Sequence, residues 1–145
     1  MPAVLLIHGP NLNLLGQREP EIYGTSTLDD YVAATTERAA SHGLTLDTIQ
    51  SNHEGVIVDA IHEARSRYQA IVINAGALTH YSWALHDALA TFAGPVVEVH
   101  ISQPNAREPW RHTSVVAPVA SGSIAGFGML GYSLAIDAVA RLLAS

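Results

Sequence analysis

Candidate acid–base residues occur in two separated parts of the sequence. The segment GPNLNLLGQREPEIYG carries Arg18 and Tyr23, and the segment EVHIS carries His100. The chain has no lysine and no cysteine, so a base that removes a proton from carbon must be sought among Tyr23, His80 and His100. A free tyrosine has a pKa of about 10 and is a poor base at neutral pH, but a close arginine would favour the tyrosinate. We therefore predict proton-transfer chemistry in which Arg18 and Tyr23 act as a pair.

The first of these segments, residues 9–24, is long for a connection in a compact domain. Connections of this kind usually take about 4–6 residues, and much longer ones are usually functional lids, binding loops or disordered segments. Glycine and proline punctuate the segment. A lid that closes over a site would exclude water and deliver Arg18 and Tyr23 together. We expect this lid at about residues 16–25.

Strand and helix patterns alternate along the chain. The apolar runs 3–8 and 70–74 are typical of strands buried on both faces. Further strands are predicted over 44–50, 95–102 and 121–128, and helices over 26–43, 56–67, 80–91 and 129–144. Such alternation predicts one α/β domain, residues 1–145, with a parallel sheet. In such sheets the ligand lies beyond the carboxyl ends of the strands.

Polar residues follow several of these strand ends and would meet at that edge. They are Asn11, Asn74, His80, His100, Ser102 and Arg111, and their hydrogen-bonding groups suit a small hydroxylated carboxylate. Each also has a structural interpretation. A single histidine at a strand end is more often structural, an asparagine can serve a tight turn, and Arg18 could be a solvated loop charge. Glu98 lies two residues before His100 on the same strand face and could orient its imidazole.

Composition and spacing disfavour several other classes of function. The formal net charge is −6 and the seven basic residues are all scattered arginines, which argues against nucleic acid as a partner. No apolar run reaches membrane-spanning length, no signal-peptide pattern opens the sequence, and cysteine is absent, so we expect a cytoplasmic protein. The glycines in GFGMLG fit a dinucleotide pattern without the later acidic residue, which predicts close strand–helix packing instead. No metal-ligand spacing stands out, and we expect neither metal nor cofactor.

Five segments together resemble the type II 3-dehydroquinate dehydratases. These are GPNLNLLGQREPEIYG, QSNHEG, NAGALTHYSWALHDAL, EVHIS and AREPWRHTSVVAPVASGSIAGFG, and they follow the family's order over nearly the whole chain. The resemblance implies a flavodoxin-like three-layer sandwich with a five-stranded parallel sheet. It implies a homododecamer built as a tetramer of trimers. It also implies a cofactor-free trans-dehydration of 3-dehydroquinate, through an enolate, in the shikimate pathway.

The resemblance also implies roles for individual residues. Tyr23 would take a proton from C2 of 3-dehydroquinate, and Arg18 would hold it as tyrosinate. Asn11 would help to position the water that stabilises the enolate. His100, with Glu98 behind it, would protonate the departing C1 hydroxyl.

The remaining implied roles concern binding and assembly. The substrate carboxylate and ring hydroxyls would be held by the backbone at Ile101 and Ser102, the Ser102 hydroxyl, Asn74, His80 and Arg111. Asp87 would reach the site of a neighbouring subunit. The sequence is 48% hydrophobic, and some of the apolar surface of the helix that carries Trp83, Leu85 and Leu89 is expected to pack against another subunit. This chain departs from many members at Ala75, where they have proline, and at His86, where they have arginine.

Two other classes of function compete with this interpretation. A flavodoxin-like module that binds a small molecule without turnover would leave the combination of Tyr23, Arg18 and His100 unexplained. A phosphate- or nucleotide-binding enzyme is disfavoured by the absence of lysine and of a complete glycine motif. A lysine-dependent dehydratase acting on the same substrate is excluded, because the chain has no lysine.

Overall fold

The computed structural model describes residues 1–145 and contains a single five-stranded sheet in the order β2-β1-β3-β4-β5. The strands are β1 (Ala3–His8), β2 (Thr45–Gln50), β3 (Ala70–Asn74), β4 (Val96–His100) and β5 (Gly122–Ala125). Every neighbouring pair is parallel, so all carboxyl ends lie at one edge. This strand order is flavodoxin-like, and the predicted α/β class is confirmed.

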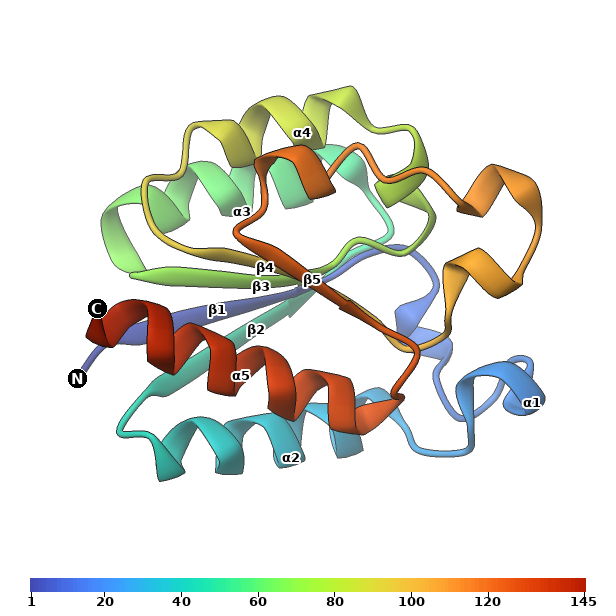
Figure 1. Ribbon diagram of the computed structural model, residues 1–145, viewed down its shortest axis with the longest axis horizontal. Helices are drawn as coiled ribbons and strands as arrows, with labels where there is room; N and C mark the ends of the chain where they lie inside the picture. Colours follow the sequence, from blue (N-terminus) through green and yellow to red (C-terminus); the bar gives the residue numbers. More distant parts are fainter.

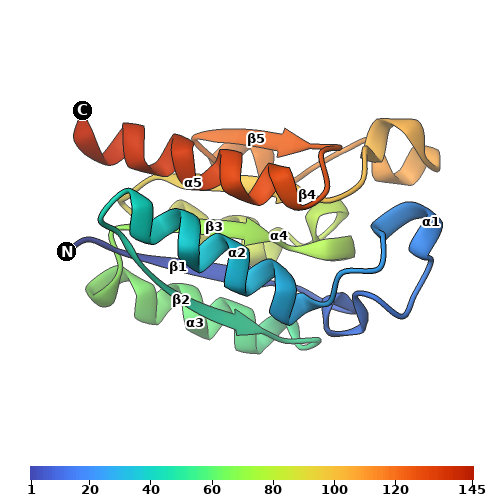
Figure 2. The same ribbon diagram turned by 90° about the horizontal axis from the view of Figure 1, so that it is seen from below.

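Helices cover both faces of the sheet. Figures 1 and 2 show α2 (Leu28–Ser41) and α5 (Met129–Ala144) on one face, and α3 (Glu54–Arg67) and α4 (Trp83–Ala90) on the other. The short helix α1 (Pro20–Tyr23) lies away from both layers, beyond the carboxyl edge of the sheet, and the chain termini lie at the opposite edge. The three-layer arrangement therefore leaves the carboxyl edge to loops and to α1.

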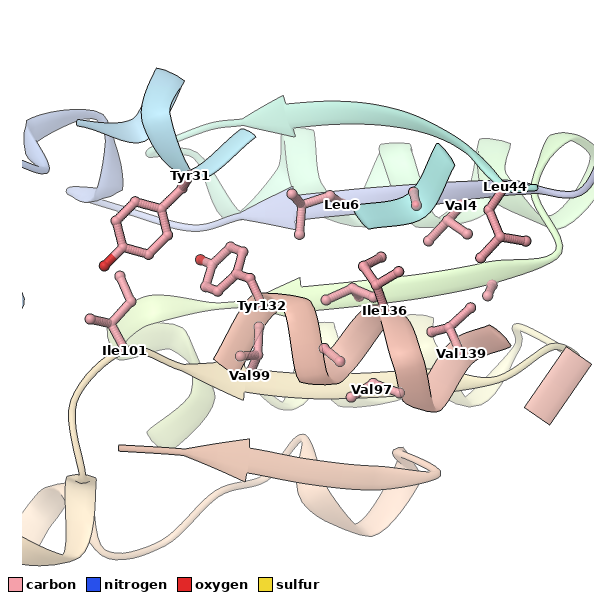
Figure 3. Packing of buried hydrophobic residues seen from close by; sticks show 14 of the residues in the cluster. Val4, Leu6, Tyr31, Leu44, Val97, Val99, Ile101, Tyr132, Ile136 and Val139 are labelled. Carbon is pink, nitrogen blue, oxygen red and sulfur yellow. The ribbon is translucent and has the colours of Figure 1, made fainter. Parts of the chain in front are cut away.

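The core is divided by the sheet into two parts, because alternate side chains of each strand point to opposite faces. Val4 and Leu6 pack toward α2 and α5 with the aromatic rings of Tyr31 and Tyr132, as Figure 3 shows. The intervening residues of β1 and β3, such as Ile7, pack toward α3 and α4. The prediction that these two strands are buried on both faces is confirmed.

Most predicted boundaries lie within a few residues of the observed ones, and the capping chemistry explains one of them. Helix α2 begins after Thr27, whose hydroxyl accepts a hydrogen bond from the Asp30 amide at 3.2 Å while the Asp30 carboxylate accepts one from the Thr27 amide at 2.9 Å. This reciprocal capping box satisfies two helix N-terminal donors. Thr27 is therefore the N-cap of α2.

Three boundaries differ from the prediction, two of them for identifiable reasons. Helix α4 begins at Trp83, because residues Gly76–His80 form a 3-10 helix and Ser82 caps α4 through the Leu85 amide. Strand β5 ends at Ala125, because Gly126 has φ +95°, outside the range of an extended strand. Strand β4 ends at His100 instead of residue 102. Both strands therefore end earlier than predicted, at the carboxyl edge, where the chain turns into loops.

Two further expectations can be compared with the packing. Leu85 and Leu89 are buried in the subunit's own core, so among the large apolar side chains of α4 only Trp83 is exposed and left to supply surface to another subunit. At Gly131 an added Cβ would lie 3.5 Å from Val99 Cγ2, an ordinary van der Waals contact, so the packing there does not require glycine; Gly126 and Gly128 instead have positive φ values of +95° and +57°. None of the helices combines the length and hydropathy that a membrane-spanning helix requires.

Candidate active site

A cavity of about 260 Å³ opens at the carboxyl edge of the sheet, beyond β1, β3 and β4. The predicted site residues that line it are Asn11, Arg18, Tyr23, Asn74, His80, His100, Ile101 and Arg111. Glu98 lies behind this wall, Ser102 lines an adjoining cavity, and Asp87 is exposed on α4 and lines neither. The structure thus gathers residues that are up to 100 positions apart in the sequence, from Asn11 to Arg111.

His100 and Glu98 form a hydrogen-bonded pair at the end of β4. His100 Nε2 lies 2.6 Å from a Glu98 carboxylate oxygen, and Glu98 is only 1% exposed. The hydroxyls of Thr79, Ser114 and Ser123 also donate to the Glu98 carboxylate. Because Nε2 is engaged by Glu98, Nδ1 is the ring nitrogen left to exchange a proton with a ligand.

The surroundings of Glu98 favour its ionised form. Burial alone would raise the pKa of Glu98, but the hydrogen bond and charge of His100, together with the hydroxyls of Ser114 and Thr79, outweigh burial and hold the pKa below its usual value. A buried carboxylate in contact with Nε2 stabilises the positive charge of a protonated imidazole. The pair is therefore suited to proton exchange between His100 Nδ1 and a bound molecule.

Tyr23 is in contact with two arginines. Arg107 Nη1 donates a hydrogen bond to the Tyr23 hydroxyl at 2.7 Å, and the guanidinium carbon of Arg18 lies 4.8 Å from the centre of the Tyr23 ring. Arg18 itself is paired with Glu19 at 2.9 Å. Both guanidinium groups therefore lie against the Tyr23 side chain.

Arg107 is the residue at this site to which the sequence analysis assigned no role. Its guanidinium Nη1 also donates to the Ser102 hydroxyl at 3.2 Å, so it links the loop after β4 to α1. The structure brings Arg18 to the face of the Tyr23 ring, but the hydroxyl receives its hydrogen bond from Arg107. The only sequence signal for this role was the position of Arg107 after a predicted strand end.

Asn74, at the end of β3, is held in one orientation. Its side-chain nitrogen donates to the Tyr132 hydroxyl at 3.0 Å, and its side-chain oxygen accepts from the Gly76 amide at 3.2 Å. Asn74 is 3% exposed but lines the cavity. The interpretation of Asn74 as a simple turn residue accounts for the Gly76 contact but not for the contact with Tyr132.

His80, Trp110 and Arg111 form another part of the cavity lining. His80 Nδ1 lies 2.8 Å from the Thr113 carbonyl oxygen, and the His80 ring packs edge-on against Trp110. Burial lowers the pKa of His80 and outweighs the opposing contact with the Thr113 carbonyl; the charges of His100 and Arg111 lower the pKa further, and the charge of Glu98 raises it. A neutral His80 that donates through Nδ1 leaves Nε2 as an acceptor for a ligand hydroxyl.

The two positions at which this chain departs from the family pattern have ordinary surroundings. Ala75 is fully buried after β3. His86 Nδ1 lies 2.6 Å from the Val115 carbonyl oxygen, so its ring is fastened to the loop that precedes β5. No group of three or more His, Cys, Asp or Glu side chains is placed to hold a metal ion.

Comparisons with known proteins agree with this geometry. A family model described as "Dehydroquinase class II" matches residues 2–140. A 3-dehydroquinate dehydratase of Roseiflexus castenholzii is 58% identical over 134 residues, 92% of this chain and 85% of the relative. One of Ruegeria pomeroyi is 54% identical over 143 residues, 99% of this chain and 96% of the relative.

A solved structure of similar architecture leads to the same family. The type II dehydroquinase from Propionibacterium acnes superposes with a TM-score of 0.94 at 42% identity, covering 97% of each chain. The family model covers nearly the whole sequence, and the relatives match it along nearly their whole lengths. This chain belongs to the class II dehydroquinase family.

Proposed function

We propose that this chain is a 3-dehydroquinate dehydratase that converts 3-dehydroquinate to 3-dehydroshikimate, an intermediate of the shikimate pathway. The observation that carries the proposal is the presence, in one cavity, of a tyrosine in contact with two arginines and of a histidine backed by a buried carboxylate. Dehydration next to a ketone needs both a base for the carbon-bound proton and an acid for the leaving hydroxyl.

Tyr23 acts as the base in this proposal. Its phenolate takes a proton from C2, and the electron pair of the broken C–H bond moves toward the C3 ketone to form an enolate. Arg107 and Arg18 stabilise the phenolate, because each places a positive charge against Tyr23. Asn11 helps to position a water that stabilises the enolate oxygen, which is the place where negative charge develops.

His100 acts as the acid. It gives a proton to the C1 hydroxyl, the C1–O bond breaks, and water leaves as the enolate becomes a C1=C2 double bond conjugated with the ketone. The Glu98 carboxylate stabilises the charge that His100 carries before this step. At the end of the reaction Tyr23 is protonated and His100 is neutral, so a proton must return from Tyr23 to His100 through solvent before the next turnover.

The substrate's other groups are held by the remaining cavity residues. The carboxylate is assigned to the backbone amides of Ile101 and Ser102 and to the Ser102 hydroxyl. That hydroxyl accepts a hydrogen bond from Arg107, which brings a positive charge to the carboxylate site. The ring hydroxyls are assigned to Asn74, His80 and Arg111, whose polar groups face the same cavity.

Residues 16–25 form the lid in this proposal. Helix α1 has no buried residue and no side-chain cap. A second cavity of about 520 Å³, lined by Ile22 and Tyr23 of α1 and by Met129 of α5, separates the two helices. This free space allows α1 to move relative to the sheet while Arg107 keeps hold of the Tyr23 hydroxyl.

A homododecamer built as a tetramer of trimers is also part of the proposal. Trp83 is 62% exposed at the start of α4, and Asp87, one turn later, is exposed and outside the cavity of its own subunit. Asp87 would then contribute to the site of a neighbour. Light scattering of the native protein, with kinetics of the Asp87→Ala variant, tests both parts; a fully active monomer would contradict them.

The decisive experiment is a spectrophotometric assay with 3-dehydroquinate, which follows the conjugated enone of the product. We expect turnover without added metal or nucleotide, unaffected by a chelator. We also expect no inactivation by borohydride in the presence of substrate, because the chain has no lysine to form an imine. Binding of 3-dehydroquinate without enone formation would favour the binding-module alternative.

A further inference from the structure

The segment QSNHEG, residues 50–55, has no role in the proposed chemistry, although it lies next to the site. Gln50 is the last residue of β2, and Ser51 continues the pairing with β1 by donating its amide to the His8 carbonyl oxygen at 3.1 Å. Residues 50–52 therefore run alongside the first residues of the loop that follows β1, where Asn11 is found. Neither Gln50 nor Asn52 lines the cavity.

The side chains of Gln50 and Asn52 hold the backbone of that loop. The Asn11 amide donates to the Asn52 side-chain oxygen at 2.9 Å. Gln50 Nε2 donates to the same oxygen at 3.2 Å and to the Gly9 carbonyl oxygen at 3.2 Å. One amide oxygen thus anchors Asn11, and Gln50 fastens that oxygen to the start of the same loop.

Asn11 needs such an anchor because its backbone is left-handed, with φ +70° and ψ −5°. Non-glycine residues rarely adopt this conformation, although asparagine tolerates it better than most. On the other side, the Gly9 amide donates to the Asn74 carbonyl oxygen at 2.8 Å, and a Cβ at Gly9 would lie 2.2 Å from the Ala75 carbonyl oxygen. The loop is therefore clamped between the ends of β2 and β3.

We propose that Asn52, held by Gln50, is a positioning residue that sets the Asn11 side chain in the cavity. The inference rests on the proposed function, in which Asn11 helps to stabilise the enolate. Stabilisation of a developing oxyanion depends on groups that are already in place before the reaction. A displaced Asn11 therefore lowers kcat, while substrate binding by the other cavity residues is retained.

The first test compares three variants of the full chain. Asn52→Ala removes the acceptor, and we expect kcat to fall by about tenfold to a hundredfold with KM within about twofold of the wild-type value. Asn52→Asp keeps a side-chain acceptor and should restore most of the turnover. Asn13→Ala is the matched control, because Asn13 is an exposed asparagine of the same loop that lies outside the cavity; its kcat should not change.

A double-mutant cycle then separates positioning from a general structural role. Asn11→Gly removes the side chain and accepts the left-handed backbone. In this background Asn52→Ala should cost less than about a further twofold in kcat, because a residue that acts only through the Asn11 side chain has nothing left to position. Equal losses in both backgrounds, or a loss in Asn52→Ala that Asn52→Asp does not relieve, would overturn the inference.

Hydrogen–deuterium exchange provides a readout that does not depend on turnover. The peptide that contains Asn11 should exchange faster in Asn52→Ala than in the wild type or in Asn13→Ala, with the remaining peptides unchanged. Unchanged exchange at Asn11 would contradict the anchoring role even if the enzyme is active. Absence of enone formation by the wild-type protein would instead overturn the proposed function, so the two failures are distinguishable.

Discussion

The end of β4 and the α1 segment supply the two proton-transfer groups, but they are built differently. At β4, Glu98 is 1% exposed and accepts hydrogen bonds from His100 and from three hydroxyls on separate segments. In α1, no residue is buried, and the Tyr23 hydroxyl receives its hydrogen bond from Arg107 alone. The acid is part of the sheet, whereas the base lies on a short helix outside the two helical layers, where the Tyr23 ring packs against the margin of the core.

This difference indicates that the acid needs rigid surroundings, whereas the base can lie on a mobile segment. A buried carboxylate–imidazole pair keeps its protonation state only if its surroundings do not move, because water would replace the hydroxyl partners. A base on a mobile segment can withdraw to admit the substrate and return to exclude water. The four predictions below test whether function follows this difference, beginning with the largest expected effect.

Replacing Tyr23 by Phe should have the largest effect on turnover. The variant keeps the ring next to Arg18 and Arg107 but lacks the oxygen that accepts the proton. General-base catalysis contributes about 10² to 10⁴ in rate, and we expect kcat to fall by at least that factor. Titration calorimetry should show that 3-dehydroquinate still binds. A variant that retains half of the wild-type kcat would make Tyr23 a packing residue and His80 the better candidate.

Glu98→Gln should lower kcat by about 10²-fold, because a neutral amide no longer stabilises a charged His100. The variant should also change how stability depends on pH. The pKa of Glu98 is lowered in the folded state, so its contribution to stability is fully present above its unfolded-state pKa and is lost as pH falls through the folded-state pKa.

The melting temperature, measured against pH, should therefore fall less steeply in acid for Glu98→Gln than for the wild type. Asp59→Asn serves as a control, because Asp59 is an exposed carboxylate of α3 far in sequence from this cluster. Normal turnover in Glu98→Gln would mean that the buried cluster serves stability alone.

Arg107→Gln should reduce kcat by about tenfold, and more than Arg18→Gln does. Arg107 is the hydrogen-bond donor to the Tyr23 hydroxyl, while Arg18 lies over the ring face and is partly neutralised by Glu19. Both variants should lose turnover, because the phenolate proposed for Tyr23 loses a neighbouring positive charge. If Arg18→Gln has the larger effect, then Arg18, and not Arg107, is the main partner of the Tyr23 hydroxyl when the lid is closed.

His8, the last residue of β1, is part of the sheet and takes no part in the proposed chemistry. Replacing it should change stability in acid and leave turnover at neutral pH almost unchanged. It is fully buried, its Nε2 has no hydrogen-bond partner, and its ring stacks on Tyr132. Burial lowers the pKa of His8 from 6.5 to about 4, although a backbone contact with Ile49 opposes this slightly. In the unfolded chain His8 is therefore protonated below pH 6.5, whereas in the folded chain it stays neutral until the pH falls to about 4.

This proton uptake by the unfolded chain should cost about 3 kcal/mol of stability between neutral pH and pH 4. In His8→Asn, denaturant unfolding at several pH values should show a shallower loss of stability over this range, whatever the offset caused by the smaller side chain. Identical pH dependence in both proteins would show that His8 is solvated or protonated in the folded state.

The fold was predicted well because its signals are local. The runs 3–8 and 70–74 are apolar at every position, which is typical of strands covered on both faces, and Thr27 with Asp30 forms a capping box readable from four residues. Boundaries were less accurate at residues 80–91, because Gly76–His80 turns into a 3-10 helix before α4 begins. That choice depends on packing against neighbouring loops.

Eight of the candidate site residues follow strand ends or lie on the first loop, and the parallel sheet brings them to one cavity. Leu85 and Leu89 illustrate the opposite case, because an apolar helix residue looks the same in sequence whether it faces its own core or a partner. The structure buries both in the core. Composition alone could not distinguish these outcomes, since both bury apolar surface.

The sequence by itself determined the α/β class, the direction of the strands, the absence of lysine chemistry and the residue types available for acid–base catalysis. Only the tertiary structure decided which side chains touch. Arg107 reaches Tyr23 across 84 positions, and Asn52 reaches Asn11 across 41. Periodicity reports which face of a strand or helix is buried, whereas a hydrogen bond between loops depends on paths that are set by the packing of the whole sheet.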